Sequence, residues 1–516
     1  MIIGLIIGAV IVGIARILFR HIHDRVPPSP TIARLHPPGP KGLPWLGNIF
    51  QIPYDSAWEV YREWGKQFES DIIRVRAPGM NIVILNSVAA ITDLFEKKSA
   101  IYSDRPYSTL LHELVGFGWA LAASGYGERL RDLRKVLHQE FNADAVKRYR
   151  VIETQFCYQL LNDIFHEPDR FSYHIRRMIM KAIYDIDLKA HDDPYVSIAE
   201  EAVEAMSTAA SAGVFLVDIL PFLKMLPEWF PGAGFQREAK RWKYAAAQML
   251  NRPWENVKSR MAHGEVFECA TTRLLERADE DTSKDPDCTH AIIAEGVGSM
   301  YGGAIDTGTS VLTSFILAMM LHPEAQQKAQ AELDEVVGKN ELPTYSDVEK
   351  LPYVGALVAE CFRSLPVTPI AVPHRVMEDD IYKGYFIPKG STVISNLYAI
   401  LHDEKVYPNP EKFDPERYLK DGKWNPAVQD ATSIVFGLGR RICPGRFMAK
   451  DVLWMSIALI LSVFRISKAM DDDGNEITPE QSFLPGLIVL PAPFKASIKV
   501  RSDAHADLIK GIRPQE

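Results

Sequence analysis

One cysteine of this chain lies in a segment that cannot form regular secondary structure. Residues 436–445 read FGLGRRICPG, and the glycines and the proline exclude a helix or a strand around Cys443. An apolar helical pattern starts at Arg446, so we expect the thiol near a helix N-terminus. Backbone N–H groups, the helix dipole and the nearby Arg441 favour the thiolate there. Such a thiolate can act as a nucleophile or as a metal ligand.

The other cysteines do not form a structural framework. The chain has 516 residues, and its 5 cysteines are odd in number, scattered and show no C-x-x-C spacing, which argues against a disulfide framework and a zinc cage. This cysteine usage suits a reducing compartment. The chain is 47% hydrophobic and 24% charged, as globular proteins are. Its net charge of −8 argues against a broad nucleic-acid-binding surface, and we expect no nucleic-acid partner.

Residues 1–19 are predicted to form a transmembrane anchor. Residues 1–15 carry no charge, and the apolar run reaches residue 19 if Arg16 snorkels to the interface. At about 1.5 Å per residue this helix spans about 28 Å, close to the thickness of a bilayer core. Arg16, Arg20 and Arg25 follow the run and predict that the rest of the chain is cytosolic. A cleaved signal peptide is the weaker alternative, because no basic region precedes the run.

The rest of the chain is predicted to form one mostly helical domain, residues 37–516, joined to the anchor by a linker over residues 20–36. The linker ends in a stiff hinge, because residues 37–44 (PPGPKGLP) are too rich in proline to continue a helix. Helical spacing of apolar residues is found in residues 122–141, 151–165, 198–212 and 238–261. Short alternating runs predict a small sheet from residues 72–75, 82–85 and 392–395.

One predicted helix is unusually long and runs over residues 289–321, where His322 and Pro323 end it. Its middle reads YGGAIDTG, and each interior glycine costs about 0.5–1 kcal/mol relative to alanine. Such glycines indicate a kink or another group close to the backbone, and a tight crossing of two buried helices is the alternative. An acid and an alcohol, Asp306 and Thr307, follow the glycines.

A possible ion-pair network lies between this helix and the cysteine loop. Glu360 and Arg363 are three residues apart and can pair on one helix face. Residues 413–417 read FDPER and supply a further arginine, Arg417. A surface salt bridge is the ordinary explanation for any such pair.

These motifs, in this order, resemble those of the cytochrome P450 family. The family pattern F-x-x-G-x-R-x-C-x-G matches residues 436–445, E-x-x-R matches residues 360–363, and the long helix resembles the oxygen-activating helix. The resemblance extends from the hinge near residue 37 to about residue 493. It implies the cytochrome P450 fold, mostly α with a small β-region, carrying an N-terminal membrane-anchor helix.

The resemblance also implies the cofactor and its ligands. Heme b (iron protoporphyrin IX) would be bound with Cys443 as the axial thiolate ligand of the iron. Leu130 stands where the family carries a tryptophan, so one propionate contact is missing or supplied by another group. Further heme-binding residues implied by the family motifs are Phe436, Gly439 and Gly445 in the loop and, for the propionates, Arg441, Arg134, His374, Arg375 and Arg105.

Asp306 and Thr307 are implied to be the catalytic residues. An acid beside a hydroxyl can relay protons through water into a dry pocket, as the family chemistry requires. The sequence departs from many relatives in carrying Gly308 in place of a second threonine and Gly303-Ala304 in place of Ala-Gly. The details of proton delivery therefore stay open.

The implied activity is a monooxygenase that inserts one oxygen atom of dioxygen into a lipophilic or aromatic small molecule. Alternatives are a heme-thiolate isomerase or dehydratase, and a non-catalytic heme-binding protein. The residue sequences of several short segments also resemble those of fungal members of secondary-metabolite pathways, including the O-methylsterigmatocystin oxidoreductase-like group. An apolar substrate pocket is expected between residues 108–121, Ala304 and its neighbours, residues 367–372 and residues 484–488, under a roof of residues 215–230. This roof is expected to dip into the membrane surface, with ordinary core packing as the alternative.

Electrons are expected to come from NADPH through a separate NADPH–cytochrome P450 reductase, with cytochrome b5 as a second candidate donor. The chain contains no G-x-G-x-x-G motif that would bind the nucleotide itself. The expected location is the endoplasmic reticulum membrane, with a single span and a cytosolic catalytic domain. A basic docking face for the reductase is expected from Arg131, Lys135, Arg440, Arg446 and Lys450.

Overall fold

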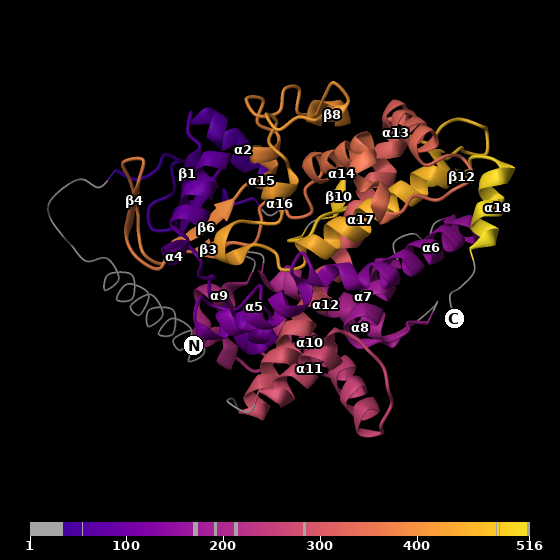
Figure 1. Ribbon diagram of the computed structural model, residues 1–516. Coiled ribbons are helices and arrows are strands. Elements are labelled where there is room, and N and C mark those ends of the chain that lie inside the picture. Colours follow the sequence, from indigo (N-terminus) through magenta and orange to yellow (C-terminus); the bar gives the residue numbers. More distant parts are fainter. Residues whose placement is uncertain are drawn as a thin grey trace.

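The computed structural model describes residues 35–53, 55–168, 174–189, 193–210, 215–281, 285–480, 482–484 and 486–512. The predicted anchor, residues 1–19, and residues 20–34 of the predicted linker lie outside these ranges. The described chain is mostly helical, and its largest sheet lies at the left of Figure 1 with the long helices packed beside it. This arrangement confirms the prediction of a mostly α fold with a small β-region.

The secondary-structure elements have the following bounds. The longer helices are α2 (Ala57–Gln67), α5 (Glu128–Phe141), α6 (Arg150–His166), α7 (His174–Tyr184), α8 (Pro194–Ala210), α10 (Gly234–Ala262), α11 (Ala270–Glu280), α12 (Pro286–Leu321), α13 (Pro323–Val336), α14 (Pro352–Ser364), α17 (Arg446–Val463) and α18 (Asp503–Gly511). Short helices are α3 (Val88–Ile91), α4 (Ser99–Tyr102), α9 (Leu216–Ile219), α15 (Leu397–Leu401) and α16 (Thr432–Val435). The strands are β1 (Ile72–Ala77), β2 (Met80–Leu85), β3 (His374–Arg375), β4 (Asp380–Tyr382), β5 (Tyr385–Ile387), β6 (Thr392–Ser395), β7 (Leu419–Lys420), β8 (Lys423–Trp424), β9 (Phe464–Lys468), β10 (Phe483–Leu484), β11 (Leu490–Pro491) and β12 (Ala496–Val500).

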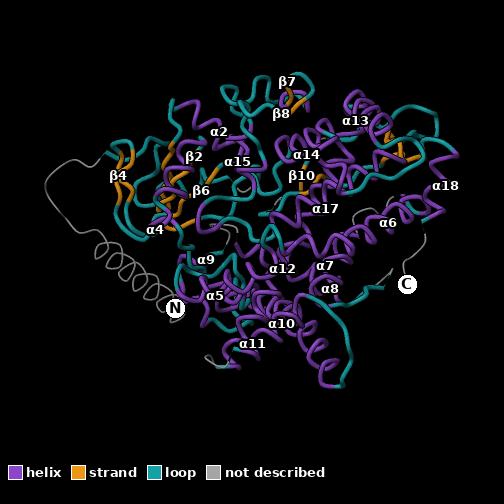
Figure 2. The backbone as a smooth tube through the Cα atoms, viewed as in Figure 1, coloured by secondary structure: helices purple, strands orange, loops and turns teal. Residues whose placement is uncertain are grey.

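The three predicted strands, β1, β2 and β6, form one sheet together with β3, in the order β1-β2-β6-β3. Strands β1 and β2 are an antiparallel hairpin, β6 pairs with β2 in parallel, and β3 closes the sheet antiparallel to β6. Alternate residues point to opposite faces. Ile73 and Ile84 pack with Tyr61 of α2 on one face, whereas Ile72 and Leu85 pack with α3 and its neighbours on the other. The remaining strands form four two-stranded sheets, and Figure 2 shows all of these strands as small elements among helices.

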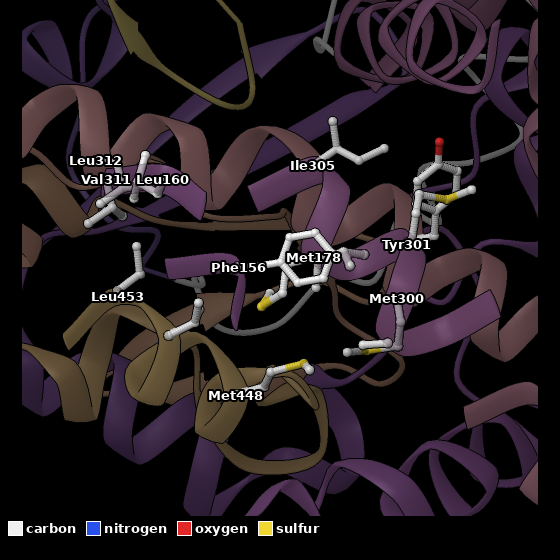
Figure 3. Close-up of a cluster of buried hydrophobic side chains, with 14 of the residues drawn as sticks. Phe156, Leu160, Met178, Met300, Tyr301, Ile305, Val311, Leu312, Met448 and Leu453 are labelled. Carbon is white, nitrogen blue, oxygen red and sulfur yellow. The ribbon is translucent and has the colours of Figure 1, made fainter. Parts of the chain in front are cut away.

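The long predicted helix is α12, which forms the centre of the helical part. It packs against α5, α7, α10, α11 and α17, and Figure 3 shows side chains of α7 and α17, together with side chains of α6, beside those of α12. Within the described chain it is the one helix whose length and apolar composition would allow a membrane crossing, but 67% of its apolar window is buried inside the protein. This burial identifies α12 as a core helix.

The predicted helix over residues 122–141 starts too early. Helix α5 begins at Glu128, and residues before it form turns. The reason is that backbone carbonyls in this segment accept hydrogen bonds from distant arginines: Ala122 O from Arg105 Nε at 3.0 Å, and Ser124 O from Arg441 Nη2 at 2.7 Å. Carbonyl groups that point toward these side chains cannot align along a helix axis.

Candidate active site

The cysteine loop folds back on itself before α17. The Cys443 N–H donates to the Phe436 carbonyl at 2.7 Å, which closes the loop. Gly439 has a φ of 58°, and a Cβ atom there would lie 2.1 Å from the carbonyl oxygen of Phe95. Only glycine allows both this left-handed backbone and this close approach. The loop is thereby pressed against the π-helical turn η1 (Thr92–Lys97).

The Cys443 thiol is surrounded by groups that stabilise negative charge. Burial raises the pKa of the thiol, while the backbone N–H groups of Gly445 and Arg446 and the cations of Arg446 and Arg134 lower it. Arg134 also donates to the Ile442 carbonyl at 2.9 Å, which fixes α5 against the loop. Because a bound cation deprotonates a coordinating thiol, this arrangement suits a metal ligand.

Two predicted propionate ligands, Arg105 and Arg441, lie close together in the interior. Arg105 donates to the carbonyls of Val372 and Pro373, both at 2.7 Å, and Arg441 donates to the carbonyl of Ser103 at 2.7 Å. Neither guanidinium group forms an ion pair with a carboxylate of the described chain. Burial and the neighbouring Arg441 lower the pKa of Arg105, and burial lowers the pKa of Arg441 to about 10. This excess of positive charge fits an anionic group.

His374 lies beside this cluster. Its Nδ1 donates to the Tyr102 carbonyl at 2.6 Å, and its ring stacks on Phe95 at a centroid distance of 4.0 Å. Burial and the nearby Arg105 and Arg441 lower the pKa of His374 well below its usual value. The neutral ring therefore carries no proton on Nε2. It can donate to a propionate only when doubly protonated, and a bound anion would favour that state.

Arg375 is placed differently from the other predicted ligands. Its side chain is 43% exposed, and its Nη1 lies 3.5 Å from Asp104 Oδ2. Its backbone N–H donates to the Asp104 carbonyl at 2.8 Å. The structure thus joins Arg375 to Asp104 and not to the cluster of Arg105 and Arg441. Leu130, in the position of the family tryptophan, is 1% exposed.

The adjacent glycines Gly302 and Gly303 of α12 have different surroundings. A Cβ atom at Gly302 would lie 2.9 Å from Met249 Cε, so this glycine allows the close crossing of α12 and α10. A Cβ atom at Gly303 would meet no heavy atom within 4 Å, and Gly303 is exposed although the helix around it is mostly buried. The tight helix crossing offered by the sequence therefore explains Gly302. Gly303 borders open space, which leaves room for another group close to the backbone.

Asp306 and Thr307 lie next to this space. The Thr307 hydroxyl donates to the Gly303 carbonyl at 2.9 Å. Asp306 Oδ1 lies 3.2 Å from Arg176 Nη2, and the same guanidinium group pairs with Glu200. Burial raises the pKa of Asp306, and Arg176 opposes this shift.

Sequence reasoning did not find Arg176 and Glu200. They lie on α7 and α8, far along the chain from Asp306, and no local motif marks them. The side chains of Arg176 and Asp306 are 15% and 19% exposed, whereas Glu200 is 51% exposed. The three residues form a charged chain from the protein surface to the interior beside Thr307.

The predicted ion pair of Glu360 and Arg363 is fully buried. Arg363 Nε lies 2.8 Å from Glu360 Oε2, and both side chains are 0% exposed. Arg417 joins the pair at 3.2 Å from Glu360 Oε1, and the Asp414 N–H donates to the same oxygen at 2.8 Å. This buried network fixes α14 to the chain segment before β7, which is a structural role.

Comparison with known proteins identifies the family. The cytochrome P450 family model matches residues 37–498. The chain belongs to the cytochrome P450 family. It is 39% identical to a cytochrome P450 monooxygenase of Armillaria gallica over 92% of this chain and 93% of the relative. It is also 39% identical to cytochrome P450 monooxygenase 98 of Postia placenta, over 92% of each chain, and to tryptamine 4-monooxygenase of Psilocybe cyanescens, over 92% of this chain and 95% of the relative.

This cytochrome P450 is a monooxygenase, and its family implies a heme-thiolate cofactor. The residues present fit that group. Cys443 offers a thiol held by N–H groups, Arg105 and Arg441 offer unpaired positive charge for propionates, and Gly303 leaves room above α12. Met300 of α12 lies 3.0 Å from the position of a Cβ atom on Gly445, so the cysteine loop and the Gly303 region are neighbours.

Three of the five predicted docking residues line a cationic cavity at the cysteine loop. Arg131, Lys135 and Arg446 line a cavity of about 290 Å³, and the remaining lining residues, Arg134, His138, Phe141 and Pro444, include no acid. Arg440 instead lies over the Tyr126 ring at 5.3 Å, and Lys450 Nζ donates to Thr432 Oγ1 at 2.7 Å.

The predicted pocket roof is rich in exposed apolar side chains. Met225 is 76% exposed and Trp229 is 81% exposed, although Val217 of the same segment is buried. Large apolar side chains gathered on one exposed segment indicate an interaction surface. Ordinary core packing therefore does not describe these two residues.

Proposed function

We propose that this protein uses heme b to insert one oxygen atom of dioxygen into a lipophilic or aromatic small molecule of fungal secondary metabolism. The observation that carries the proposal is that the Cys443 loop lies against Met300 of α12. Met300 precedes Gly303 by three residues, so it lies about one turn from the open face of α12 at Gly303. The thiol and the acid–alcohol pair thereby lie near the same stretch of α12, and the cationic Arg441 belongs to the cysteine loop itself.

The protein residues have separable tasks. Heme, when bound, supplies the activation of dioxygen and the oxidation of the substrate. Cys443 would ligate the iron, and Arg105 and Arg441 would hold the propionates with Arg134 bracing the loop. The loop residues Phe436, Gly439 and Gly445 would pack against the macrocycle. His374 is proposed to bind a propionate in its doubly protonated form. Arg375 is proposed to act on the propionate site only indirectly, through its ion pair with Asp104.

Asp306 and Thr307 are proposed to deliver protons. Thr307 keeps a hydroxyl oxygen at the open face of α12 while its proton is shared with the Gly303 carbonyl. Asp306 can take up a proton at its carboxylate, because burial raises its pKa. Arg176 and Glu200 connect Asp306 to solvent, so protons have a polar route through a largely apolar interior.

Retention of this acid–alcohol pair supports a monooxygenase over a heme-thiolate isomerase or dehydratase, which needs no proton delivery to dioxygen. It equally argues against a non-catalytic heme-binding protein. The relatives reported above all carry the word monooxygenase in their names. No described feature favours either alternative.

The proposed electron donor is NADPH–cytochrome P450 reductase, with cytochrome b5 as a second donor, docked on the basic face near Cys443. The cavity of about 290 Å³ with four basic side chains and one histidine supports this placement, since donor proteins with acidic surfaces would be steered to it. We further propose a location on the endoplasmic reticulum membrane, with an anchor at residues 1–19 and the exposed roof around Trp229 touching the lipid surface.

Incubation with reductase, NADPH and isotopically labelled dioxygen tests the proposal. Terpenoid, polyketide and aromatic compounds are supplied as candidate substrates. We expect product that carries one labelled oxygen atom, formed only when reductase and NADPH are both present. Product that forms without either of them, or without the label, would contradict the monooxygenase mechanism.

A further inference from the structure

A second cavity lies beyond the proposed active site. It has a volume of about 250 Å³, is open to solvent on one side, and is lined by residues of α2, α15, β10 and the C-terminal ends of α12 and α14. The first α12 residue in its lining is Ser314, which follows Thr307 by seven residues, or about 10 Å along the helix. None of the residues assigned above to the heme lines this cavity.

Hydrogen bonds of Val489 fix one side of the cavity. Val489 lines the cavity, its N–H donates to the Val367 carbonyl at 2.8 Å, and its carbonyl accepts from the Ser310 hydroxyl at 2.6 Å. Residues 367–372 and 484–488 are the segments predicted to line the substrate pocket. Pro369 of the first segment also lines this cavity, so the cavity adjoins the predicted substrate pocket.

Several aromatic rings line the cavity among aliphatic and proline side chains. The Trp58 and Tyr398 rings lie 6.4 Å apart between centroids, and His402 stacks on Tyr398 at 4.2 Å. Phe413 and Phe483 complete the aromatic part of the lining. Flat apolar walls of this kind hold an aromatic ring, and their faces attract a cation.

The polar groups of the cavity accept hydrogen bonds. His402 is 5% exposed, its Nδ1 donates to the Tyr398 carbonyl at 2.9 Å, and burial lowers its pKa to about 4, so the neutral ring leaves Nε2 as an acceptor. Ser314 is 3% exposed and forms no hydrogen bond to another residue of the described chain. At the exposed rim, Glu59 has no cationic partner among the described residues, whereas Glu411 is paired with Arg62.

We propose that this cavity binds an aromatic amine that carries a hydroxyl group. The ring packs against the Trp58 and Tyr398 rings, the ammonium group lies at the rim beside Glu59, and the hydroxyl donates to His402 or Ser314 at the base. The two donors of such a ligand, one at each end of its aromatic ring, complement the exposed carboxylate of Glu59 and the buried acceptors His402 and Ser314. The proposal does not depend on the function of the heme site.

Tyramine is the probe, and two analogues test the contributions of its hydroxyl group and of its amine to binding. 2-Phenylethylamine lacks the hydroxyl group, and 3-(4-hydroxyphenyl)propionate carries a carboxylate in place of the amine. Binding is measured by calorimetry on the full-length holoenzyme in its ferrous carbon monoxide form, because carbon monoxide then blocks coordination of the amine to iron. We expect tyramine to bind about fivefold more tightly than 2-phenylethylamine, as one hydrogen bond allows, and the propionate not to bind.

Two variants and a control locate the binding. Glu59→Gln is expected to weaken both amines about fivefold. Glu63→Gln, one turn further along α2 and paired with Lys66, is expected to change neither. Ser364→Leu fills the cavity from the end of α14 and is expected to abolish binding while the carbon monoxide spectrum stays unchanged.

Amine binding that is equal in the wild type, Glu59→Gln and Ser364→Leu would overturn the proposal, as would the absence of tyramine binding to the wild type. If Ser364→Leu fails to fold, its carbon monoxide spectrum reveals this, and the surface variant Glu59→Gln then decides alone. A normal carbon monoxide spectrum without tyramine binding would reject the second site and leave the heme site intact.

Discussion

Single residues set the position of the proposed heme ligand. Gly439 lets the cysteine loop lie against the backbone of Phe95, while the N–H groups of Gly445 and Arg446 point at the Cys443 sulfur. The F-x-x-G-x-R-x-C-x-G pattern predicts the cysteine and the glycines. It does not predict Phe95 as the surface against which Gly439 packs, because that contact joins residues 344 positions apart in the sequence.

Two glycines of the loop offer a matched pair of variants. Gly437 and Gly439 both have positive φ angles, 76° and 58°, so alanine costs backbone energy of about 1 kcal/mol at either position. Only at Gly439 would the new Cβ atom also collide with Phe95. We expect Gly439→Ala to lose most bound heme and Gly437→Ala to keep most of it, measured as heme per protein. Equal heme contents would show that the contact with Phe95 does not position the loop.

Glu153 gives the protein a pH-dependent stability. Its side chain is buried, Tyr345 donates to Oε2 at 2.5 Å, and Oε1 has no partner in the described chain. Burial raises its pKa from 4.5 to about 8. Between about pH 4.5 and pH 8 the folded protein keeps a proton on Glu153 that the unfolded chain has lost. The free energy of unfolding therefore falls as the pH rises through this window.

Glu153→Gln removes this titration. We expect the melting temperature of the variant, relative to the wild type, to be higher at pH 8 than at pH 5, with a difference on the order of a few kcal/mol in unfolding free energy. Scanning calorimetry of both proteins at the two pH values measures it. Parallel pH profiles would mean that Glu153 is already ionised in the folded protein.

At the scale of elements, α12 connects the proposed proton route to the core. Its length and its glycines are evident in the sequence, and the structure assigns Gly302 to the crossing with α10 and Gly303 to the open space. The partners of Asp306 could not be predicted, since Arg176 and Glu200 reach it only after α7 and α8 pack against α12. Local periodicity determines helices, but it does not determine which faces meet.

Arg176 and Glu200 should move the pKa of Asp306 in opposite directions. Arg176 lowers that pKa and Glu200 raises it. Arg176→Gln is therefore expected to shift the acid–base transition in the pH profile of product formation upward by about one unit or less, and Glu200→Gln downward. Shifts in the same direction, or none, would show that this charged chain does not control Asp306.

At the scale of the whole molecule, different surfaces are suited to different partners. The cationic cavity at the cysteine loop suits an acidic electron donor, and the exposed apolar segment around Trp229 suits lipid. The aromatic composition of residues 215–230 predicts the apolar segment. The cavity could not be foreseen as a cavity, because its lining comes from α5 and from the segment around Pro444, which meet only in the folded chain.

Tryptophan fluorescence in vesicles tests the membrane contact. Full-length protein is reconstituted in phospholipid vesicles that contain a spin-labelled lipid, which quenches nearby tryptophans. Trp229 is 81% exposed and Trp424, on β8, is 40% exposed. We expect Trp229→Phe to reduce the fluorescence intensity that is lost to the quencher and Trp424→Phe to leave that lost intensity unchanged. Equal quenching in the two variants would contradict contact between the roof and the membrane.

The most direct test of the account is the carbon monoxide difference spectrum of the reduced protein. We predict a strongly red-shifted Soret band, which a thiolate-ligated ferrous heme gives with carbon monoxide, in the wild type and in the control variant Cys361→Ala. In Cys443→Ala this band should be absent. A red-shifted band that survives in folded Cys443→Ala, or a folded wild type without heme, would contradict the assignment of Cys443 as the iron ligand and the mechanism built on it.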